Sequence, residues 1–141
     1  MAEFFLKKRA EEKGLNIEVR SCGTFASIGD ISTKEAIQVM AEDYNMDLAQ
    51  HRATNIQHAR IREADLILCA TLSHKQIVLN MFPDLEGKVY TMKEFIGEEP
   101  GIKSDISDPW GHGIEVYRQC AAEVADTVDK IADKLEKLQN E

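Results

Sequence analysis

The sequence predicts an α/β domain with a parallel sheet, and three observations lead to this class. Apolar residues recur at helical spacing in several separate stretches of the chain. Between them lies "DLILCAT" (65–71), a continuous apolar run typical of a strand that is buried on both faces. Expected strands and helices alternate along the chain, which favours parallel strands joined by right-handed crossovers.

The bulk composition predicts one domain over residues 1–141 and excludes several classes of function. A net charge of -8 argues against a nucleic-acid surface or an anionic-membrane surface. No apolar stretch approaches the ~20 residues that span a bilayer, and no signal peptide is recognisable. Three widely spaced cysteines do not form a disulfide framework, so we expect reduced thiols and a cytoplasmic protein.

The opening stretch predicts a helix over residues 1–13. Its apolar residues form one stripe, and Gly14 follows Lys13 as a stop. No Ser, Thr, Asp or Asn precedes the stripe, so the chain begins inside a helix without an N-cap. A short strand is expected next, ending at Gly23.

The middle of the chain predicts two more helices before the buried strand. Ser32 and Glu35 match a capping box, with a helical stripe following over 32–48. The stretch 55–64 is expected to form a short helix, and the strand 65–71 follows it.

The remaining elements alternate in the same way. A helix is expected over 73–82 with Ser73 as its cap, then a strand over 87–92 and a loop over 97–113. A long helix from Ile114 to Leu138 closes the chain. Only three strands can be identified, fewer than usual for this much helix, which indicates that a strand is missing.

Four stretches together resemble the low-molecular-weight protein-tyrosine phosphatase family over essentially the whole chain. They are "MAEFFLKKRAEEKGLNIEVRSCGT", "HRA", "ADLILCAT" and "DISDPWGHGIEVYRQC". The stretch "LSHKQIVLNMF…KVYTMKEFIG…DISDPWGHGIEVYRQ" is more similar to the protein-arginine-phosphatase branch than to the tyrosine-specific branch. The resemblance implies a three-layer α/β/α fold, a phosphorylated protein as substrate and a cysteinyl-phosphate intermediate.

The resemblance also implies that the N-terminal part of the family pattern is absent. In the family, "MAE" directly follows the phosphate-binding loop C-x5-R-S-P, which follows the first, central strand. Neither is present here, so we expect an N-terminally truncated chain. One deletion then explains both the missing N-cap and the missing strand. The nucleophilic cysteine and the phosphate-binding arginine then have no counterpart, and the chain is predicted to be inactive.

None of the cysteines replaces that nucleophile in the sequence. The chemistry needs a thiolate with an arginine six residues later. At that offset stand Ile28 after Cys22, Asp126 after Cys120 and Lys75 after Cys69. The ammonium group of lysine is a point charge and lacks the planar, two-pronged geometry with which an arginine guanidinium binds phosphate. We therefore interpret Cys69 as a small buried apolar residue at a strand end.

The resemblance assigns the general acid and base to Asp108. One carboxyl on a mobile loop can protonate the leaving atom and later accept a proton from water. By composition alone, "DPWG" is an ordinary turn. Trp110 takes the place of the aromatic residue that lines the family's pocket, although a core tryptophan is the alternative.

Three further residues match positions around the family's active site. Ser21 and His51 resemble residues that hydrogen-bond behind the phosphate loop and hold its shape, although both could equally be local caps. Phe25 lies in a loop that borders the site, where it could form a wall of the substrate pocket.

No metal ligands and no cofactor are expected, because the histidines and cysteines lack ligand spacing. A catalytically dead module that binds partners is the alternative to a phosphatase. An arsenate reductase ranks lower, because Cys69 and Cys120 do not sit as a close pair. The missing strand also predicts that copies could form a strand-exchanged dimer.

Overall fold

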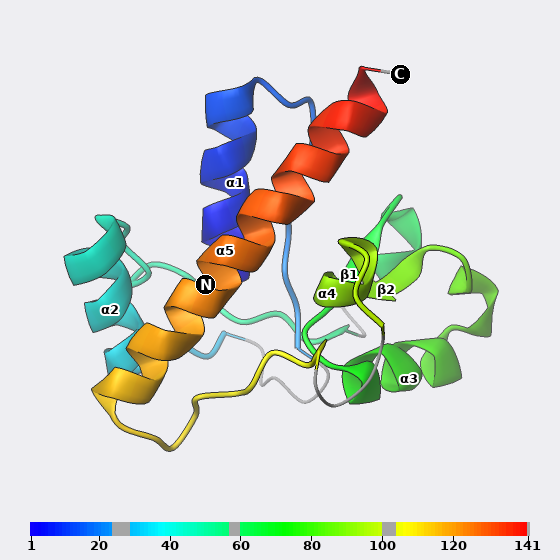
Figure 1. Ribbon diagram of the computed structural model, residues 1–141. Coiled ribbons are helices and arrows are strands. Elements are labelled where there is room, and N and C mark those ends of the chain that lie inside the picture. Colours follow the sequence, from blue (N-terminus) through cyan, green and yellow to red (C-terminus); the bar gives the residue numbers. More distant parts are fainter. Residues whose placement is uncertain (24–28, 57–59, 100–103, 141) are drawn as a thin grey trace.

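The computed structural model describes residues 1–23, 29–56, 60–99 and 104–140 (Figure 1). Its helices, strands and 3₁₀ turns (η) follow one another along the chain. In order they are α1 (Ala2–Lys13), α2 (Lys34–Tyr44), η2 (Ile61–Glu63), β1 (Ile67–Cys69), α3 (Leu72–Met81), η3 (Pro83–Leu85), β2 (Val89–Thr91), α4 (Met92–Phe95) and α5 (Ile114–Gln139). No helix of this described part is long and apolar enough to cross a membrane.

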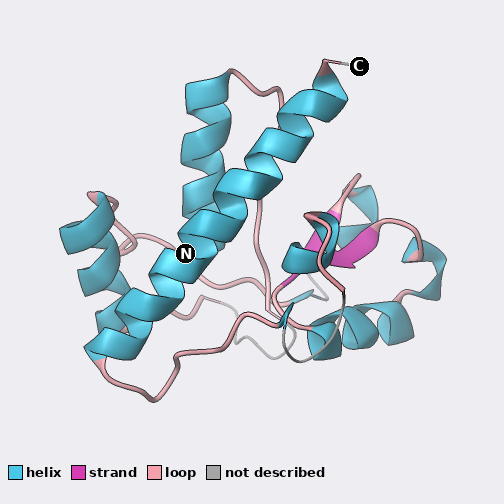
Figure 2. Cartoon of the chain, viewed as in Figure 1, coloured by secondary structure: helices cyan, strands magenta, loops and turns pink. Residues whose placement is uncertain are grey.

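The described sheet consists of β1 and β2, which pair in parallel (Figure 2). Leu68 lies opposite Tyr90, and both pack against the core cluster that includes α5. Ile67 and Val89 point to the other face, into a second cluster with Val78 of α3. Since successive side chains alternate between faces, helices on both sides bury the two strands. The strands predicted over 65–71 and 87–92 are confirmed with shorter bounds.

Helix α5 forms the centre of the larger core and contacts α1, α2 and α4. Its buried face includes Ala121, Val128 and Ile131, as the spacing of apolar residues predicts. A salt bridge also joins α1 to α5, since the Lys13 ammonium group lies 2.8 Å from the Asp133 carboxylate. The long C-terminal helix predicted from the sequence is therefore confirmed.

Helix α1 also agrees with its prediction at both ends. Met1 occupies the N-cap position and its side chain makes no capping hydrogen bond. At the other end Gly14 adopts φ 66°, a left-handed conformation that glycine enters without a steric penalty.

The strand predicted to end at Gly23 is wrong as a regular strand. Residues 15–22 are extended but join no ladder in the described chain, and Gly23 alone forms a bridge with Asn55. Ile17 and Val19 are half-buried while Glu18 and Arg20 are exposed, and this alternation does not require a strand partner.

Two predicted caps are displaced by one or two residues. Thr33, and not Ser32, caps α2 by accepting a hydrogen bond from the Ala36 amide at 3.3 Å. Likewise Thr71 caps α3 in place of Ser73. In each case the burial of apolar helix residues sets where the helix begins, and the nearest extended hydroxyl residue then serves as the cap.

Two short elements also differ from the prediction. The helix expected over 55–64 is wrong: its described residues contain only a 3₁₀ turn, η2, and 57–59 lie outside the described residues. Helix α4, which was not predicted, follows β2 directly. Thr91 and Glu94 form a reciprocal capping box there, which stabilises a helix of only four residues.

Candidate functional site

The segment carrying Asp108 is fixed at the carboxyl end of β1. The Ile106 amide donates to the Ala70 carbonyl at 2.9 Å. The Asp105 carboxylate accepts from the Leu72 amide, at the start of α3, at 2.8 Å. Ligands of parallel α/β sheets bind outside the carboxyl ends of the strands, so these hydrogen bonds bring the loop to the expected edge.

At the tip of this loop, Asp108 and Trp110 are both exposed. The Asp108 carboxylate accepts from the Trp110 amide at 3.0 Å, which closes a turn around the buried Pro109. The side chain of Trp110 is 73% exposed, so the alternative of a core tryptophan is wrong. An exposed carboxylate beside an exposed indole can meet a ligand from solvent.

Cys120 connects this loop to α5. Its thiol donates to the Ser107 carbonyl at 3.5 Å and is buried. Burial raises the pKa of this thiol, and the charges of Glu123 and Asp108 raise it further. Cys120 thus supports the loop while remaining protonated.

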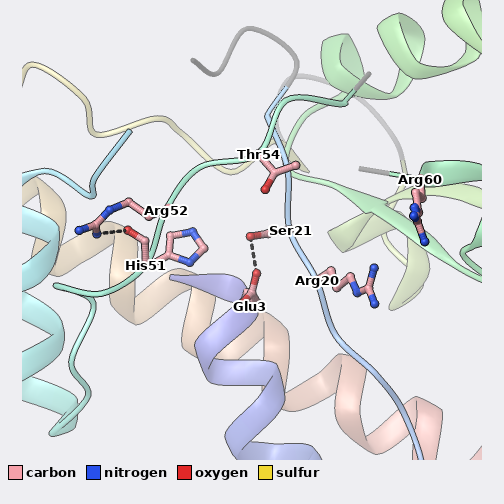
Figure 3. A pocket seen from close by; sticks show the side chains of 7 residues that line it. All are labelled: Glu3, Arg20, Ser21, His51, Arg52, Thr54 and Arg60. Atoms are coloured by element: carbon pink, nitrogen blue, oxygen red, sulfur yellow. Dashed lines mark hydrogen bonds between the residues drawn. The ribbon is translucent and has the colours of Figure 1, made fainter. Parts of the chain in front are cut away.

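Ser21 and His51 lie in a second place, a cavity of about 380 Å³ (Figure 3). The Ser21 hydroxyl donates to the Glu3 carboxylate at 2.6 Å, so its partner is a side chain of α1 and not a local backbone group. Although burial opposes its charge, hydrogen bonds from Lys7 and Ser21 lower the pKa of Glu3. The His51 ring contacts Phe4 edge-on, with centroids 5.5 Å apart.

The structure therefore places the predicted residues in two groups. Ser21 and His51 line the cavity, whereas Asp108 and Trp110 are not among its lining residues. Phe25 lies outside the described residues. Sequence reasoning missed the other members of the cavity lining, because it assigned no role to them, although some lie within stretches that carry the family resemblance. They are Glu3, Arg20, Arg52, Thr54 and Arg60.

The environments of the thiols disfavour a nucleophile. Burial raises the pKa of Cys69 to about 11, and partial desolvation raises that of Cys22. Lys75 cannot serve Cys69 as an anion-binding partner, since its ammonium group contacts both oxygens of Glu94 at 2.8 and 3.1 Å. Buried Cys69 matches the interpretation of a small apolar residue.

The raised pKa of Cys69 predicts a loss of stability in alkali. The native state keeps the thiol protonated up to about pH 11, whereas the unfolded chain ionises near 9.0. The unfolded state binds fewer protons between these values, so stability present below pH 9.0 decreases as pH rises, by on the order of 2 kcal/mol. Urea unfolding across this range should show a smaller decrease for Cys69→Ala. Equal slopes for both proteins would contradict the prediction.

Within the described residues, no cluster of His, Cys, Asp or Glu is arranged to hold a metal ion. The functional groups available in this part of the chain are thus the carboxylate and indole of the 105–110 loop and the arginine-lined cavity beside α1.

Comparison with known proteins relates the whole chain to one family. The family model for low molecular weight phosphotyrosine protein phosphatase matches residues 1–141. A protein-arginine-phosphatase of Bacillus subtilis is 34% identical over 97% of this chain and 88% of its own length. The low molecular weight protein-tyrosine-phosphatase PtpB of Staphylococcus epidermidis is 30% identical, covering 84% of this chain and 79% of the relative.

A solved structure shows the same fold. The crystal structure of a YwlE mutant from Bacillus subtilis superposes with a TM-score of 0.87 at 34% identity. The match covers 96% of this chain and 88% of the solved chain.

Proposed function

The chain belongs to the low molecular weight phosphotyrosine protein phosphatase family, and from this premise we propose that it is the scaffold of a phosphatase acting on phosphorylated proteins. The observation that carries the proposal is the position of Asp108. Two hydrogen bonds hold its loop at the carboxyl end of β1, where α/β enzymes bind ligands. We assign Asp108 the role of general acid and base.

In this proposal Asp108 acts twice. It donates a proton to the oxygen or nitrogen that leaves phosphorus as a cysteine thiolate attacks. The resulting carboxylate then takes a proton from the water that hydrolyses the cysteinyl-phosphate. Exposure of Asp108 on a loop flanked by Gly111 and Gly113 permits it to approach a bound substrate.

The other predicted residues position the reacting groups or the substrate. Trp110 stacks on the side chain that carries the phosphate, by ring contact with a phenol or cation–π contact with a guanidinium. Ser21 and His51 support the phosphate-binding loop from behind, consistent with the hydrogen bond of Ser21 to Glu3 of α1.

We infer that phosphoarginine is the preferred substrate, with phosphotyrosine as the alternative. The B. subtilis relative, which shares 34% identity over nearly all of this chain, is a protein-arginine-phosphatase. The S. epidermidis relative, which is 30% identical, is a protein-tyrosine-phosphatase, and phosphotyrosine is therefore the alternative substrate.

We also propose that the 141-residue chain by itself does not turn substrate over, since its sequence has no cysteine followed by arginine at the sixth position. A binding module without catalysis is the second candidate function. The exposed indole of Trp110, beside a carboxylate and away from the core, favours binding of a ligand even without a nucleophile.

The test of the catalytic assignment uses a longer form in which an apolar strand and a C-x5-R-S-P loop precede Met1. We expect Asp108→Asn to lower kcat on a phosphoarginine peptide by a factor of about 10²–10³, because the leaving atom loses its proton donor. Asp126→Asn, an exposed change on α5, is the matched control and should leave kcat unaltered.

The same protein separates the two substrate classes. Side-by-side assays with phosphoarginine and phosphotyrosine peptides should give the higher kcat/KM for phosphoarginine. A higher value for phosphotyrosine would overturn the substrate assignment, whereas an unchanged kcat in Asp108→Asn on both peptides would overturn the role of Asp108.

A further inference from the structure

The charged side chains in the C-terminal half of α5 lie on two different faces of the helix. Its acidic residues form ion pairs with α1: Asp129 lies 2.9 Å from Arg9, and Asp133 lies 2.8 Å from Lys13. Three lysines occupy another face, because they follow one another at the i, i+4 and i+7 spacing of a helical stripe. They are Lys130, Lys134 and Lys137. Helix α1 thus neutralises the acidic face of α5.

The three lysines line a groove of about 290 Å³, which we call the lysine groove. Its other lining residues are Asp133 and the half-buried Ile96, which directly follows α4 and supplies apolar surface. The carboxylate of Asp133 is already paired with Lys13. Three ammonium groups beside one neutralised carboxylate favour a negatively charged ligand.

The ammonium groups of the lysine groove are available to such a ligand. Lys134 is held in place, because it donates to the Phe95 carbonyl at 2.6 Å and lies 4.3 Å from the centroid of the Phe95 ring. An ammonium group has three donors, so this contact leaves others for a ligand. Lys130 contacts Asp126 at 3.2 Å in an exposed pair of the kind that contributes little, and Lys137 forms no ion pair within the described chain.

The lysine groove is separate from the candidate catalytic loop. Figure 1 shows the C-terminal half of α5 passing α4 at the end of the helix remote from the 105–113 loop. Lys130 follows Ile114, the first residue of α5, by 16 positions, which corresponds to about 24 Å along the helix. The lysine groove also shares no lining residue with the cavity beside Ser21. A ligand bound there leaves the Asp108 loop accessible.

The charge of the whole chain restricts what this ligand is. A net charge of -8 repels an extended polyanion such as a nucleic acid or an anionic membrane. A short acidic peptide interacts mainly with the nearby lysines, because salt screens charges beyond about 8 Å. Lys130 and Lys137 are seven residues apart, about 10 Å along α5, which a few residues of peptide span.

We propose that the lysine groove binds a short acidic segment of a partner protein, in which carboxylates flank one apolar side chain. The carboxylates pair with Lys130, Lys134 and Lys137, and the apolar side chain contacts Ile96. This interaction serves to hold a partner on the protein and does not require catalysis at the Asp108 loop.

The test uses the 141-residue chain and a fluorescently labelled peptide, Glu-Glu-Leu-Glu-Glu, at about 20 mM salt. We expect saturable binding by fluorescence anisotropy, with changes in the amide resonances of Ile96 and of residues 130–137 and none in the 105–110 loop. The peptide Gln-Gln-Leu-Gln-Gln should not bind, and Glu-Glu-Ser-Glu-Glu should bind about fivefold more weakly because it lacks the apolar contact. Absence of saturable binding, or resonance changes confined to other residues, would overturn the proposal.

A pair of matched variants tests the role of the lysines. Lys130→Gln combined with Lys137→Gln should weaken binding about fivefold at low salt, and the difference should disappear at about 0.5 M salt. Lys8→Gln combined with Lys34→Gln changes the net charge equally at exposed positions of α1 and α2 and should leave the affinity within about twofold. Equal weakening by both pairs would overturn the proposal. So would tighter binding to anionic lipid vesicles than to the peptide, or self-association that the Lys130 and Lys137 changes abolish, since these would assign the lysine groove to a membrane or to a second copy.

Discussion

The 141-residue chain is expected to hydrolyse aryl phosphates and phosphoarginine peptides no faster than the uncatalysed background. Formation of a cysteinyl-phosphate needs a thiolate at neutral pH beside a cluster of anion-binding donors. Burial holds the pKa of Cys69 at about 11 and raises that of Cys120. Neither thiol is therefore ionised to a useful extent at neutral pH.

Exposed Cys22 does not supply the missing group either. Its pKa is raised and not lowered, and the residue six positions later is Ile28, which cannot bind a phosphate oxygen. Asp108 alone can donate a proton but cannot form the covalent intermediate. Compared with an active form that has a C-x5-R-S-P loop, the 141-residue chain should therefore lack the entire enzymatic rate enhancement, which amounts to many powers of ten.

The measurement is release of p-nitrophenol and of inorganic phosphate by the 141-residue chain, with the longer form as the positive control. If one thiol of this chain were the nucleophile, the matching change among Cys22→Ser, Cys69→Ala and Cys120→Ala should abolish turnover, and the other two should not. Activity above background that one of these changes abolishes would contradict the prediction and identify the nucleophile.

A second large effect is expected in the core of α5. The Ile131 side chain is 0% exposed and belongs to the cluster that joins α5 to α1 and α2. Ile131→Ala removes buried methyl and methylene groups and leaves a cavity, so it should lower the free energy of unfolding by about 3 kcal/mol. Urea unfolding followed by helical circular dichroism measures this change.

Leu138→Ala is the matched control on the same helix. Leu138 continues the apolar spacing of the sequence, but its side chain is 49% exposed near the end of α5. Its truncation should cost less than about 1 kcal/mol, because little apolar surface returns to water. Similar losses for both variants would show that the C-terminal turn is buried in solution.

The difference between Ile131 and Leu138 shows how far sequence patterns predict this fold. Periodicity correctly identifies α1, α5 and the two paired strands, because it depends on which face of an element is apolar. It cannot tell how much of that face another element covers. For the same reason the alternation of residues 17–23 predicted a strand, although the described chain offers it no ladder beyond the Gly23 bridge.

The sequence likewise predicted only part of the candidate site. The motif "DPWG" was sufficient to propose Asp108, but only the structure showed that Trp110 is exposed and that Ile106 and Asp105 attach the loop to the end of β1. Arg52, within "HRA", and Arg60 received no role from the sequence, and they share a cavity because separate loops converge beside α1.

By itself the sequence determined the family, the order of the main helices and paired strands, and the lack of a C-x5-R motif, since each is a matter of residue type and spacing along the chain. Among the described residues, tertiary structure alone decided which thiols are buried and which residue caps each helix. Burial and hydrogen bonding depend on contacts between residues that lie far apart in sequence, and such contacts leave no periodic trace in any one segment.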